Sequence, residues 1–390
     1  QEWDAAATGL PRAEIAAFIA ESATTEKVVT LWSQGVNQST AGTDKASAIL
    51  DCHIAMGRIG RPGMGPFSVT GQPNAMGGRE VGALATMLAG HLDWADAPAL
   101  QGFWRSPTIA TKPGLKAVDL FRAAGRGEVG ALWVMATNPA MSLPDGEAVR
   151  RALARIPMLA VSDCHAGTDT QRHAHVLLPA LGWGEKDGTV TNSERVISRQ
   201  RRFLPAPGEA RADWWIVAQL AARLGWGEHF AWDGPAAIFR EHAAVTTLAR
   251  PAPRVFDLSG LAGISDADYA AMAPVQWPVP AAGPPGGRIT PPTQRLVEPA
   301  FRPPAHAGAL VLLTGRLRDQ WHSMTRTGRV PRLMAHAPEP VLHAHPEDAL
   351  HLEDGALVEV RSAWGAAVLR LEKDARQRRG ACFAPMHWTE

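Results

Sequence analysis

The sequence has few cysteines, and the three that it has lie far apart. They are Cys52, Cys164 and Cys382 in a chain of 390 residues. This wide spacing fits neither a disulfide framework nor the closely spaced thiolates of a zinc or iron–sulfur site. The sequence therefore predicts no metal site made of its own cysteines, and we interpret all three as small buried apolar side chains.

The sequence also lacks an excess of charge of one sign and a long apolar run. It has 39 basic and 38 acidic residues and a net charge of +1, so no overall field attracts nucleic acid or a charged membrane surface. No apolar run reaches the ~20 residues that span a bilayer. We therefore predict no nucleic-acid partner and no membrane span, and any bound anion must be met by local charges.

The standard nucleotide-binding motifs and a start methionine are absent as well. Neither G-x-G-x-x-G nor G-x-x-x-x-G-K-[ST] occurs, so a bound nucleotide would have to be held by other loops. Residues 1–25 show no charged segment followed by an apolar one, the pattern that begins a secretory signal. Because the first residue is Gln1, we expect the chain to be a piece of a longer protein.

Alternating strand and helix patterns fill most of the first 250 residues. Short apolar runs end in loops rich in Asn, Asp, Ser and Thr, and amphipathic segments follow them. Such βαβ units build parallel sheets, in which the loops at the carboxyl ends of the strands hold ligands. The sequence therefore predicts an α/β fold with parallel sheets that carry a nucleotide. We expect strands at 28–32, 131–135, 158–162 and 175–179, and helices at 12–23, 44–59, 146–155 and 214–224.

A change in composition divides the chain after residue 250. Between Pro251 and Pro304 the chain is rich in proline and has few periodic segments, which predicts a linker or an extended wrapping arm. After it, segments at 309–315, 356–362 and 366–372 predict a small β-barrel, with the last two strands joined by a tight turn. The barrel stops at Glu390 without an evident closing strand, so we expect it to be incomplete.

Several loop residues are candidates for ligand binding, and each has a plain structural alternative. Asn138 marks either a turn or a ligand contact. The carboxylate of Asp163, after Ser162, either caps a helix or accepts hydrogen bonds from the N–H groups of a guanine. Lys186 is either part of a solvated hairpin or a point charge for a carbonyl or phosphate. Asp213 is first of all the expected N-cap of the helix that follows it.

Three histidines close in sequence invite a metal interpretation, which we reject. His165, His173 and His175 are separated by a loop, and no further residues complete a coordination sphere.

The segment at 314–326 is difficult to explain as a solvated loop. It gathers cations, hydrogen-bond donors and an indole into one short connection, and exposed loops seldom use tryptophan in this way. Phosphate and a flat heterocycle are plausible ligands for such a set. Its notable residues are Arg316, Arg318, Trp321, His322 and Thr325.

Taken together, six stretches of the chain resemble the molybdopterin oxidoreductases that carry bis-molybdopterin guanine dinucleotide. Within that superfamily the chain is most similar to assimilatory nitrate reductase catalytic subunits, with periplasmic nitrate reductases as near relatives. The resemblance covers nearly the whole chain. The stretches are WSQGVNQST (32–40), IGRPGMGPFSVTGQPNAMGGREVG (59–82), TNP (137–139), SD (162–163), VLLPALGWGEKDGTVTNSER (176–195) and TGRLRDQWHSMTRTG (314–328).

This resemblance implies four domains around the cofactor, of which the chain holds the later part. The cysteine motif for a [4Fe–4S] cluster and the segment with the cysteine ligand to molybdenum have no counterpart here, so both are expected in a missing N-terminal part. Residues 1–69 would end the first α/β (Rossmann-like) cofactor-binding domain, and residues 70–250 would form the second. The proline-rich linker or wrapping arm would follow at 251–305, and a truncated molybdopterin-dinucleotide-binding β-barrel at 306–390.

The same resemblance implies bis-molybdopterin guanine dinucleotide with molybdenum as the cofactor. No residue of this chain is assigned to the metal. The implied cofactor-binding residues are Gln34, Gly35, Asn37, Gln38, Asn138, Ser162, Asp163, Lys186, Asp213, Thr314, Gly315, Arg316, Trp321, His322 and Ser323.

The implied reaction is the reduction of nitrate to nitrite in nitrate assimilation. Arg79 is expected to bind nitrate, because a planar guanidinium gives a flat anion two parallel hydrogen bonds and a full charge. Gln72 is expected to donate to a substrate oxygen, and Gln34 to lie close to the metal. The plain alternative for Arg79 is an ion pair with a neighbouring acid at a helix start.

The expected electron donor is ferredoxin, flavodoxin or an NADH-linked reductase subunit, and the expected compartment is the cytoplasm, with the periplasm as the alternative. Two other functions stay open. Formate dehydrogenases share the fold and cofactor, although the stretch at 71–82 is of the nitrate-reducing type. The second alternative is that the chain as given is a non-catalytic cofactor-binding fragment, because the cluster and metal-ligand segments are missing.

Overall fold

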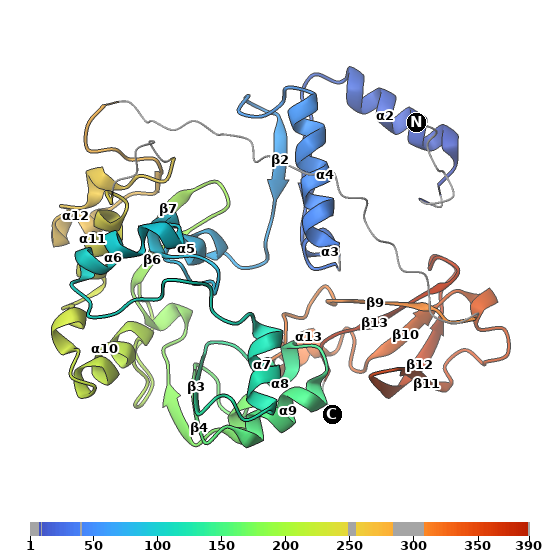
Figure 1. Cartoon of the computed structure of the whole chain (residues 1–390). Helices are drawn as coiled ribbons and strands as arrows, with labels where there is room; N and C mark the ends of the chain where they lie inside the picture. The colour runs from blue at the N-terminus through green and yellow to red at the C-terminus, as the bar shows by residue number, and fades with distance from the viewer. Residues whose placement is uncertain (1–7, 9, 40, 249–254, 284–307, 389–390) are drawn as a thin grey trace. The chain divides into compact units, whose positions relative to one another are not determined.

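The computed structural model describes residues 8, 10–39, 41–248, 255–283 and 308–388 (Figure 1). Contacts within the chain divide it into two compact units, each assembled from three separate stretches. Unit 1 takes in Gln1–Phe103, Gly188–Gln200 and Gly234–Arg302, and unit 2 takes in Trp104–Asp187, Arg201–Asp233 and Pro303–Glu390. The sequence boundaries at 69, 250 and 305 do not coincide with this division, and the four-domain organisation stays a prediction.

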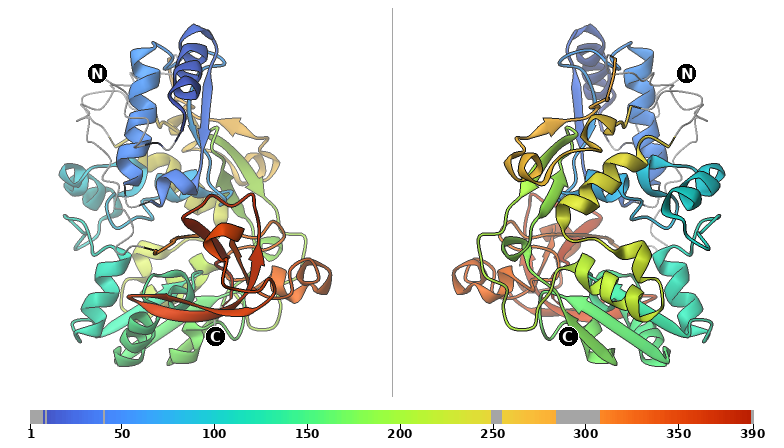
Figure 2. Two further views of the ribbon diagram at one scale, coloured as in Figure 1. Left: turned by 90° about the vertical axis from the view of Figure 1, so that its right-hand side faces the viewer. Right: turned by 90° about the vertical axis from the view of Figure 1, so that its left-hand side faces the viewer.

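Unit 1 contains a parallel pair of strands with a helix beside it. β1 (Val29–Trp32) pairs with β2 (Gly65–Ser68), and α4 (Gly42–Ala55) lies along them (Figure 2). This is the predicted strand–loop–helix order. α4 ends before the predicted position 59 because the chain turns at Gly57, whose φ of +61° is one that residues with a side chain avoid. The other helices here are α2 (Arg12–Thr24) and α3 (Gln34–Asn37).

An antiparallel sheet and several helices complete unit 1. β6 (Gly188–Thr191), β7 (Val196–Gln200) and β8 (Val275–Gln276) pair in that order, and α11 (Pro235–Val245) contacts β6. The short elements are α5 (Ala75–Glu80), η1 (Ala89–His91), η2 (Trp94–Asp96), α6 (Ala97–Trp104), η6 (Ser259–Leu261) and α12 (Asp266–Ala271). The core consists of Ile197, Phe239, Ala243, Phe256, Leu258, Tyr269, Met272 and Trp277.

The described part of the proline-rich stretch is not a linker. Residues 255–283 supply η6, α12 and β8, and the rings of Phe256, Tyr269 and Trp277 are buried in the core of unit 1. The linker prediction is therefore wrong for these residues, and the wrapping arm stays a prediction. Proline interrupts regular periodicity, which concealed the burial of these rings in the sequence. Residues 251–254 and 284–305 lie outside the described part of the chain.

Unit 2 contains a parallel sheet in the order β3–β4–β5. The strands are β3 (Ala131–Met135), β4 (Met158–Asp163) and β5 (Val176–Pro179), close to their predicted positions. α7 (Ala117–Gly125) precedes the sheet, and α8 (Pro139–Ser142), α9 (Gly146–Arg155) and η3 (Thr170–His173) lie between the strands in sequence (Figure 1). Helices and sheet share one core, whose large residues are Phe121, Val134, Val149, Leu153, Ile156, Leu159 and Val161.

The C-terminal part of unit 2 is a five-stranded mixed sheet. Its order is β11–β12–β10–β13–β9, so β11 and β9 are the edges. Within the described residues the predicted barrel is thus an open sheet. β11 and β12 form a hairpin in which Ser362 lies opposite Gly365, which confirms the predicted tight turn. The strands are β9 (Val311–Gly315), β10 (Val341–Ala344), β11 (Leu357–Ser362), β12 (Gly365–Lys373) and β13 (Ala381–Pro385).

The remaining elements of unit 2 are mostly single turns. They are η4 (Trp183–Glu185), α10 (Asp213–Arg223), η5 (Gly227–Phe230), η7 (Thr327–Arg329), α13 (Pro331–Met334) and η8 (Pro346–Asp348). Over the described ranges of both units, no helix combines the length and the apolar character needed to cross a membrane.

The interpretation of the cysteines as buried side chains is wrong for two of the three. Cys382 belongs to the core of the mixed sheet, whereas Cys52 and Cys164 are exposed. Cys164 follows directly after β4, where the chain leaves the sheet for a loop, and this accounts for its exposure.

The buried His53 of α4 makes the stability of unit 1 depend on pH. Its Nε2 lies 2.8 Å from Thr30 Oγ1 of β1, and burial, followed by the charge of Arg58, lowers the pKa of His53 below 6.5. The unfolded chain therefore takes up a proton more readily than the folded one. The free energy of unfolding should be constant with respect to this group above about pH 6.5 and should fall as the pH drops towards the folded pKa.

Urea unfolding at several pH values between 8 and 5 measures this dependence. The variant His53→Gln, which has no titrating ring, should show a shallower loss of stability on acidification than the wild type. Equal slopes in the two proteins would contradict the assignment.

Candidate functional site

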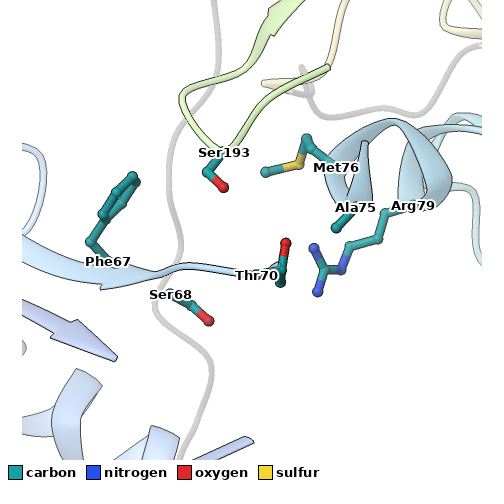
Figure 3. A pocket seen from close by; sticks show the side chains of 7 residues that line it. All are labelled: Phe67, Ser68, Thr70, Ala75, Met76, Arg79 and Ser193. Carbon is teal, nitrogen blue, oxygen red and sulfur yellow. The ribbon is translucent and has the colours of Figure 1, made fainter. Parts of the chain in front are cut away.

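A small cavity lies in unit 1 beyond the carboxyl end of β2. Its volume is about 290 Å³, which suits a small molecule or ion rather than a dinucleotide. Figure 3 shows α5 on one side of it and the turn between β6 and β7 on another. The lining residues are Phe67, Ser68, Thr70, Ala75, Met76, Arg79 and Ser193.

Arg79 is the charged residue of this lining. Its guanidinium lies beside Thr70 at the cavity (Figure 3), and among the described residues it makes no hydrogen bond or ion pair. The neighbouring acid, Glu80, is buried and accepts hydrogen bonds from Thr191 and Trp277 instead. The alternative that Arg79 pairs with a neighbouring acid is therefore wrong, and the cation is available to an anion that enters the cavity.

The loop after β1 is tied to the cavity by Asn37. Its Oδ1 accepts a hydrogen bond from the indole of Trp32 (3.0 Å), and its Nδ2 donates to Ser68 Oγ (3.1 Å) at the end of β2. Asn37 thus holds the carboxyl ends of both strands together. Gln34 and Gly35 begin α3 in the same loop, and Gln38 follows its last residue.

The predicted substrate residues are only partly brought together. Arg79 lines the cavity, whereas Gln34 and Gln72 are not among its lining residues. The backbone of Gln72 lies next to a lining residue, since its carbonyl oxygen accepts a hydrogen bond from the hydroxyl of Thr70 (3.1 Å).

Three hydroxyl groups of the cavity were missed by the sequence reasoning. Ser68 ends β2 and Thr70 follows it, positions that the rule on strand ends could have identified. Ser193 comes from a turn more than a hundred residues further along the chain, and nothing in its local sequence indicated the cavity. Together with Arg79, these groups offer one cation and several hydrogen-bond donors.

In unit 2 the loop after β3 is fixed by Asn138. Its Oδ1 accepts hydrogen bonds from the backbone N–H (3.1 Å) and the hydroxyl (2.7 Å) of Thr170, and its Nδ2 donates to Asp169 (3.2 Å). Asn138 is only 8% exposed. The amide therefore joins the loops after β3 and β4, in addition to any contact with a ligand.

The two predicted residues at the end of β4 differ in accessibility. Ser162 is fully buried, and its hydroxyl accepts a hydrogen bond from the indole of Trp133 (2.8 Å). Asp163 is partly exposed, and its carboxylate accepts a hydrogen bond from the backbone N–H of His165 (3.1 Å), which forms a local turn rather than a helix cap.

Lys186 and Asp213 form an ion pair, with Nζ and Oδ2 2.8 Å apart and each side chain 32% exposed. The N-cap interpretation of Asp213 is wrong, because α10 begins at Asp213 itself and no side chain caps it. The carboxylate turns to Lys186 because the backbone of Leu181 donates to Arg211 O (3.0 Å), which brings the two chain segments together.

The loop after β9 has a strained, closely held conformation. Thr314 and Gly315 end the strand, and the guanidinium of Arg316 lies 4.3 Å from the centre of the Trp321 ring. His322 and Met324 have φ values of 41° and 54°, which are unusual for residues with a side chain. Ser323 lies between these two strained residues.

The buried His387, two residues after the end of β13, holds this loop. Its Nε2 accepts a hydrogen bond from the backbone N–H of Leu317 (2.8 Å), and its Nδ1 lies 2.6 Å from the carbonyl oxygen of His322. The carbonyl is an acceptor only, so Nδ1 carries the proton and the ring is neutral. Nothing in the sequence around His387 had indicated this role.

Positive charge gathers where this loop meets the loop after β4. Arg329 donates to the carbonyl oxygen of Ala166 (3.2 Å). Burial is the main cause that lowers the pKa of His165, and the charges of Arg329 and Arg326 lower it further against the opposing effect of Asp163. Burial, then the charge of Arg316, likewise lowers the pKa of His322. The arrangement suits a ligand with negative charge.

The three histidines of the rejected metal interpretation are not grouped as ligands. The Nδ1 atom of His175 accepts a hydrogen bond from the backbone N–H of Leu159 (3.0 Å), a structural role. Across the described part of the chain, no three His, Cys, Asp or Glu side chains lie in an arrangement that could hold a metal ion.

Comparison with known families matches two parts of the chain. The model of the molybdopterin oxidoreductase family matches residues 12–223. The model described as molydopterin dinucleotide binding domain matches residues 310–390, which contain the mixed sheet and the loop after β9.

Individual proteins are similar over most of the chain. A nitrate reductase from Klebsiella oxytoca is 50% identical over 100% of this chain and 47% of its own length. The alpha subunit of an F420-dependent formate dehydrogenase from Methanocaldococcus jannaschii is 30% identical over 94% of this chain and 54% of its own. The chain thus spans about half the length of these two relatives.

A solved structure has a similar fold. The acetylene hydratase from Pelobacter acetylenicus superposes with a TM-score of 0.54 at 20% identity, over 69% of this chain and 39% of the hydratase chain. This likeness supports the mixed α/β architecture with parallel sheets.

Replacing His387 should loosen the loop after β9. His387→Ala leaves the N–H of Leu317 and the carbonyl of His322 without their partner, and such a loss costs roughly 1–3 kcal/mol per group. We expect trypsin to cleave after Arg316 and Arg318 about tenfold faster or more, because local opening becomes easier. The exposed His351→Ala is the matched control and should leave the cleavage rate unchanged. Equal rates in all three proteins would show that His387 does not hold the loop.

Proposed function

The chain belongs to the molybdopterin oxidoreductase family, and we propose that it is part of a nitrate reductase catalytic subunit that reduces nitrate to nitrite. The balanced reaction takes two electrons and two protons with nitrate and gives nitrite and water. The observation that carries the proposal is the cavity with the guanidinium of Arg79, which makes no hydrogen bond or ion pair to any residue that the structure describes. The 50% identity to a nitrate reductase, against 30% to a formate dehydrogenase, favours nitrate over formate.

The hydrogen-bonding groups and charges of the loop residues fit bis-molybdopterin guanine dinucleotide. The carboxylates of Asp163 and Asp213 match the N–H donors of guanine, and the cation of Lys186 matches its carbonyl or a phosphate. When bound, this cofactor supplies the two-electron redox chemistry. The remaining proposed contacts are Gln34, Gly35, Asn37, Gln38, Asn138, Ser162 and the loop residues Thr314, Gly315, Arg316, Trp321, His322 and Ser323.

The role of the cavity is to bind and orient the anion. The guanidinium of Arg79 offers nitrate two parallel hydrogen bonds and a full charge. The hydroxyls of Ser68 and Ser193 line the same space, so they can donate to the oxygens that Arg79 leaves free, whereas the hydroxyl of Thr70 already donates to Gln72. Gln72 and Gln34 remain proposed as the further donor and the side chain near the metal.

The organisation of the whole protein is also a proposal. We propose the two Rossmann-like cofactor-binding domains and the incomplete β-barrel of the sequence analysis, with a [4Fe–4S] cluster in a part that this chain does not contain. The proposed electron donor is ferredoxin, flavodoxin or an NADH-linked reductase subunit. Assimilation of nitrate in the cytoplasm is the physiological setting that the resemblance favours.

Substrate turnover by the full-length enzyme separates nitrate reductase from formate dehydrogenase. Nitrate-dependent oxidation of a reduced dye is expected, and formate oxidation without nitrate reduction would overturn the proposal. The other alternative, a non-catalytic fragment, concerns the 390 residues in isolation. Molybdenum analysis of that purified fragment tests it, since stoichiometric metal together with nitrate reductase activity would rule the alternative out.

In the full-length enzyme, Arg79→Lys should raise the KM for nitrate or lower turnover. Lysine keeps the charge and loses the second parallel hydrogen bond, and a loss of about 1.4 kcal/mol corresponds to a factor of ten in affinity. Molybdenum content should stay close to that of the wild type. The exposed Arg12→Lys on α2 is the matched control and should change neither quantity. If Arg79→Lys loses molybdenum instead, Arg79 is structural and its assignment to the substrate is wrong.

A further inference from the structure

A buried carboxylate stands next to the proposed anion-binding residue. Glu80 ends α5, directly after Arg79, and is 2% exposed. Its Oε1 accepts a hydrogen bond from Trp277 Nε1 (2.7 Å), and its Oε2 accepts one from Thr191 Oγ1 (2.9 Å). The ring of His242 lies farther off, with Nε2 3.7 Å from Oε2.

Thr191 holds both ends of α5 at once. Its hydroxyl donates to Glu80 at the C-terminal end, and its backbone N–H donates to Oδ1 of Asn74 (2.8 Å) at the N-terminal end. Asn74 is the residue before the helix, and its side chain folds over Gly77. A Cβ atom at Gly77 would lie 2.1 Å from Asn74 Oδ1, so this glycine is what lets the asparagine reach the strand.

Helix α5 depends on such anchors. It has six residues, and isolated helices shorter than about 12 residues are barely stable in water. A buried carboxylate that lost one of its donors would be left poorly solvated, so each hydrogen bond to Glu80 resists displacement of the helix. The position of α5 is therefore set by β6 rather than by the helix itself.

The same anchors join two walls of the cavity. Arg79, Ala75 and Met76 line it from α5, and Ser193 lines it from the turn that follows Thr191 (Figure 3). A shift of α5 along β6 would move the guanidinium relative to the hydroxyl of Ser193. Anion binding by a planar cation with two hydrogen bonds is sensitive to such displacements.

We propose that Asn74, Glu80 and Thr191 form a clamp that fixes the Arg79 guanidinium in its anion-binding position. These three are positioning residues, since they act through Arg79 rather than on the substrate. The proposal rests on the proposed function of Arg79 as the receptor for nitrate.

The first test compares Thr191→Val with Thr191→Ser in the full-length, cofactor-loaded enzyme. Valine keeps the shape and the backbone donor but removes the hydroxyl that reaches Glu80, whereas serine retains it. We expect Thr191→Val to raise the KM for nitrate about fivefold to tenfold, with kcat changed less than twofold. Thr191→Ser should stay within about twofold of the wild type, because it restores the donor to Glu80.

A second measurement reports binding without turnover. Nitrate should raise the thermal midpoint of the oxidised wild-type enzyme, because a ligand that binds only the folded state stabilises it. This rise should shrink in Thr191→Val and be kept in Thr191→Ser. Leu258→Ala, which removes buried methyl groups from the same core and no hydrogen-bonding group of the clamp, controls for general destabilisation and should keep the nitrate-induced rise.

A double-mutant cycle with Arg79→Lys decides whether the clamp acts through the arginine. If it does, Thr191→Val should add little to the KM once Arg79 is already replaced. Additive effects on the KM would overturn the proposal, as would an unchanged KM in Thr191→Val. If Thr191→Val does not fold, Asn74→Ala replaces it in the same double-mutant cycle. Asn74 is the exposed member of the clamp, at the N-terminal end of α5.

The proposed function fails separately from the clamp. If the wild-type enzyme does not reduce nitrate, nitrate reduction itself is wrong. If the wild type reduces nitrate and the cycle is additive, only the clamp is wrong.

Discussion

The buried carboxylate of Glu80 connects four segments of unit 1 that are far apart in the sequence. It accepts hydrogen bonds from β6 and from the segment after β8, and it lies near α11 through His242. A buried polar group is tolerated only while its hydrogen-bond donors stay in place, so Glu80 fixes the relative positions of the segments that supply them. The cavity, the orientation of α5 and the accessibility of Arg79 all follow from this arrangement.

In unit 2, loops that are distant in sequence are held together by neutral groups and by one ion pair. The loops at the carboxyl ends of β3 and β4 are cross-linked by Asn138, and the loop after β5 is joined to α10 by Lys186 and Asp213. These side chains hold the loops in shape before any ligand is considered. The structure shows the structural role of each of these residues, and the contact with a ligand is the proposed one.

The parts of the fold that the sequence predicted well are those governed by local pattern. The apolar runs at 131–135 and 158–162 became β3 and β4, and the helix at 146–155 became α9, because short-range periodicity and turn residues suffice there. The linker interpretation of residues 255–283 and the N-cap at Asp213 were predicted wrongly because their outcome depends on partners distant in sequence. The buried Trp277 donates a hydrogen bond to Glu80, and Lys186 donates one to Asp213.

The residues of the site likewise divide into those that the sequence predicted and those whose position depends on distant parts of the chain. Arg79 was predicted from the resemblance and from the fit of a planar guanidinium to a flat anion. That it makes no ion pair among the described residues depends on the direction in which Glu80 turns, which only the structure gave. Ser193 lies in the stretch at 176–195 that carries the resemblance, but nothing in that stretch marked its hydroxyl, and His387 came from a segment with no recognisable motif. Their positions result from the pairing of β6 with β7 and from the length of β13, which local sequence does not encode.

The order in which the chain is synthesised gives the Glu80 contacts a particular meaning. Thr191 and Trp277 lie 111 and 197 residues after Glu80. During translation, α5 therefore leaves the ribosome long before Thr191 and Trp277, which donate hydrogen bonds to Glu80, have been synthesised. Contacts between distant residues stabilise the fold only after the chain between them has formed a closed loop. The cavity beside Arg79 should therefore be among the last features to form. A nascent chain that ends before about residue 277 should expose the side chain of Glu80 to solvent.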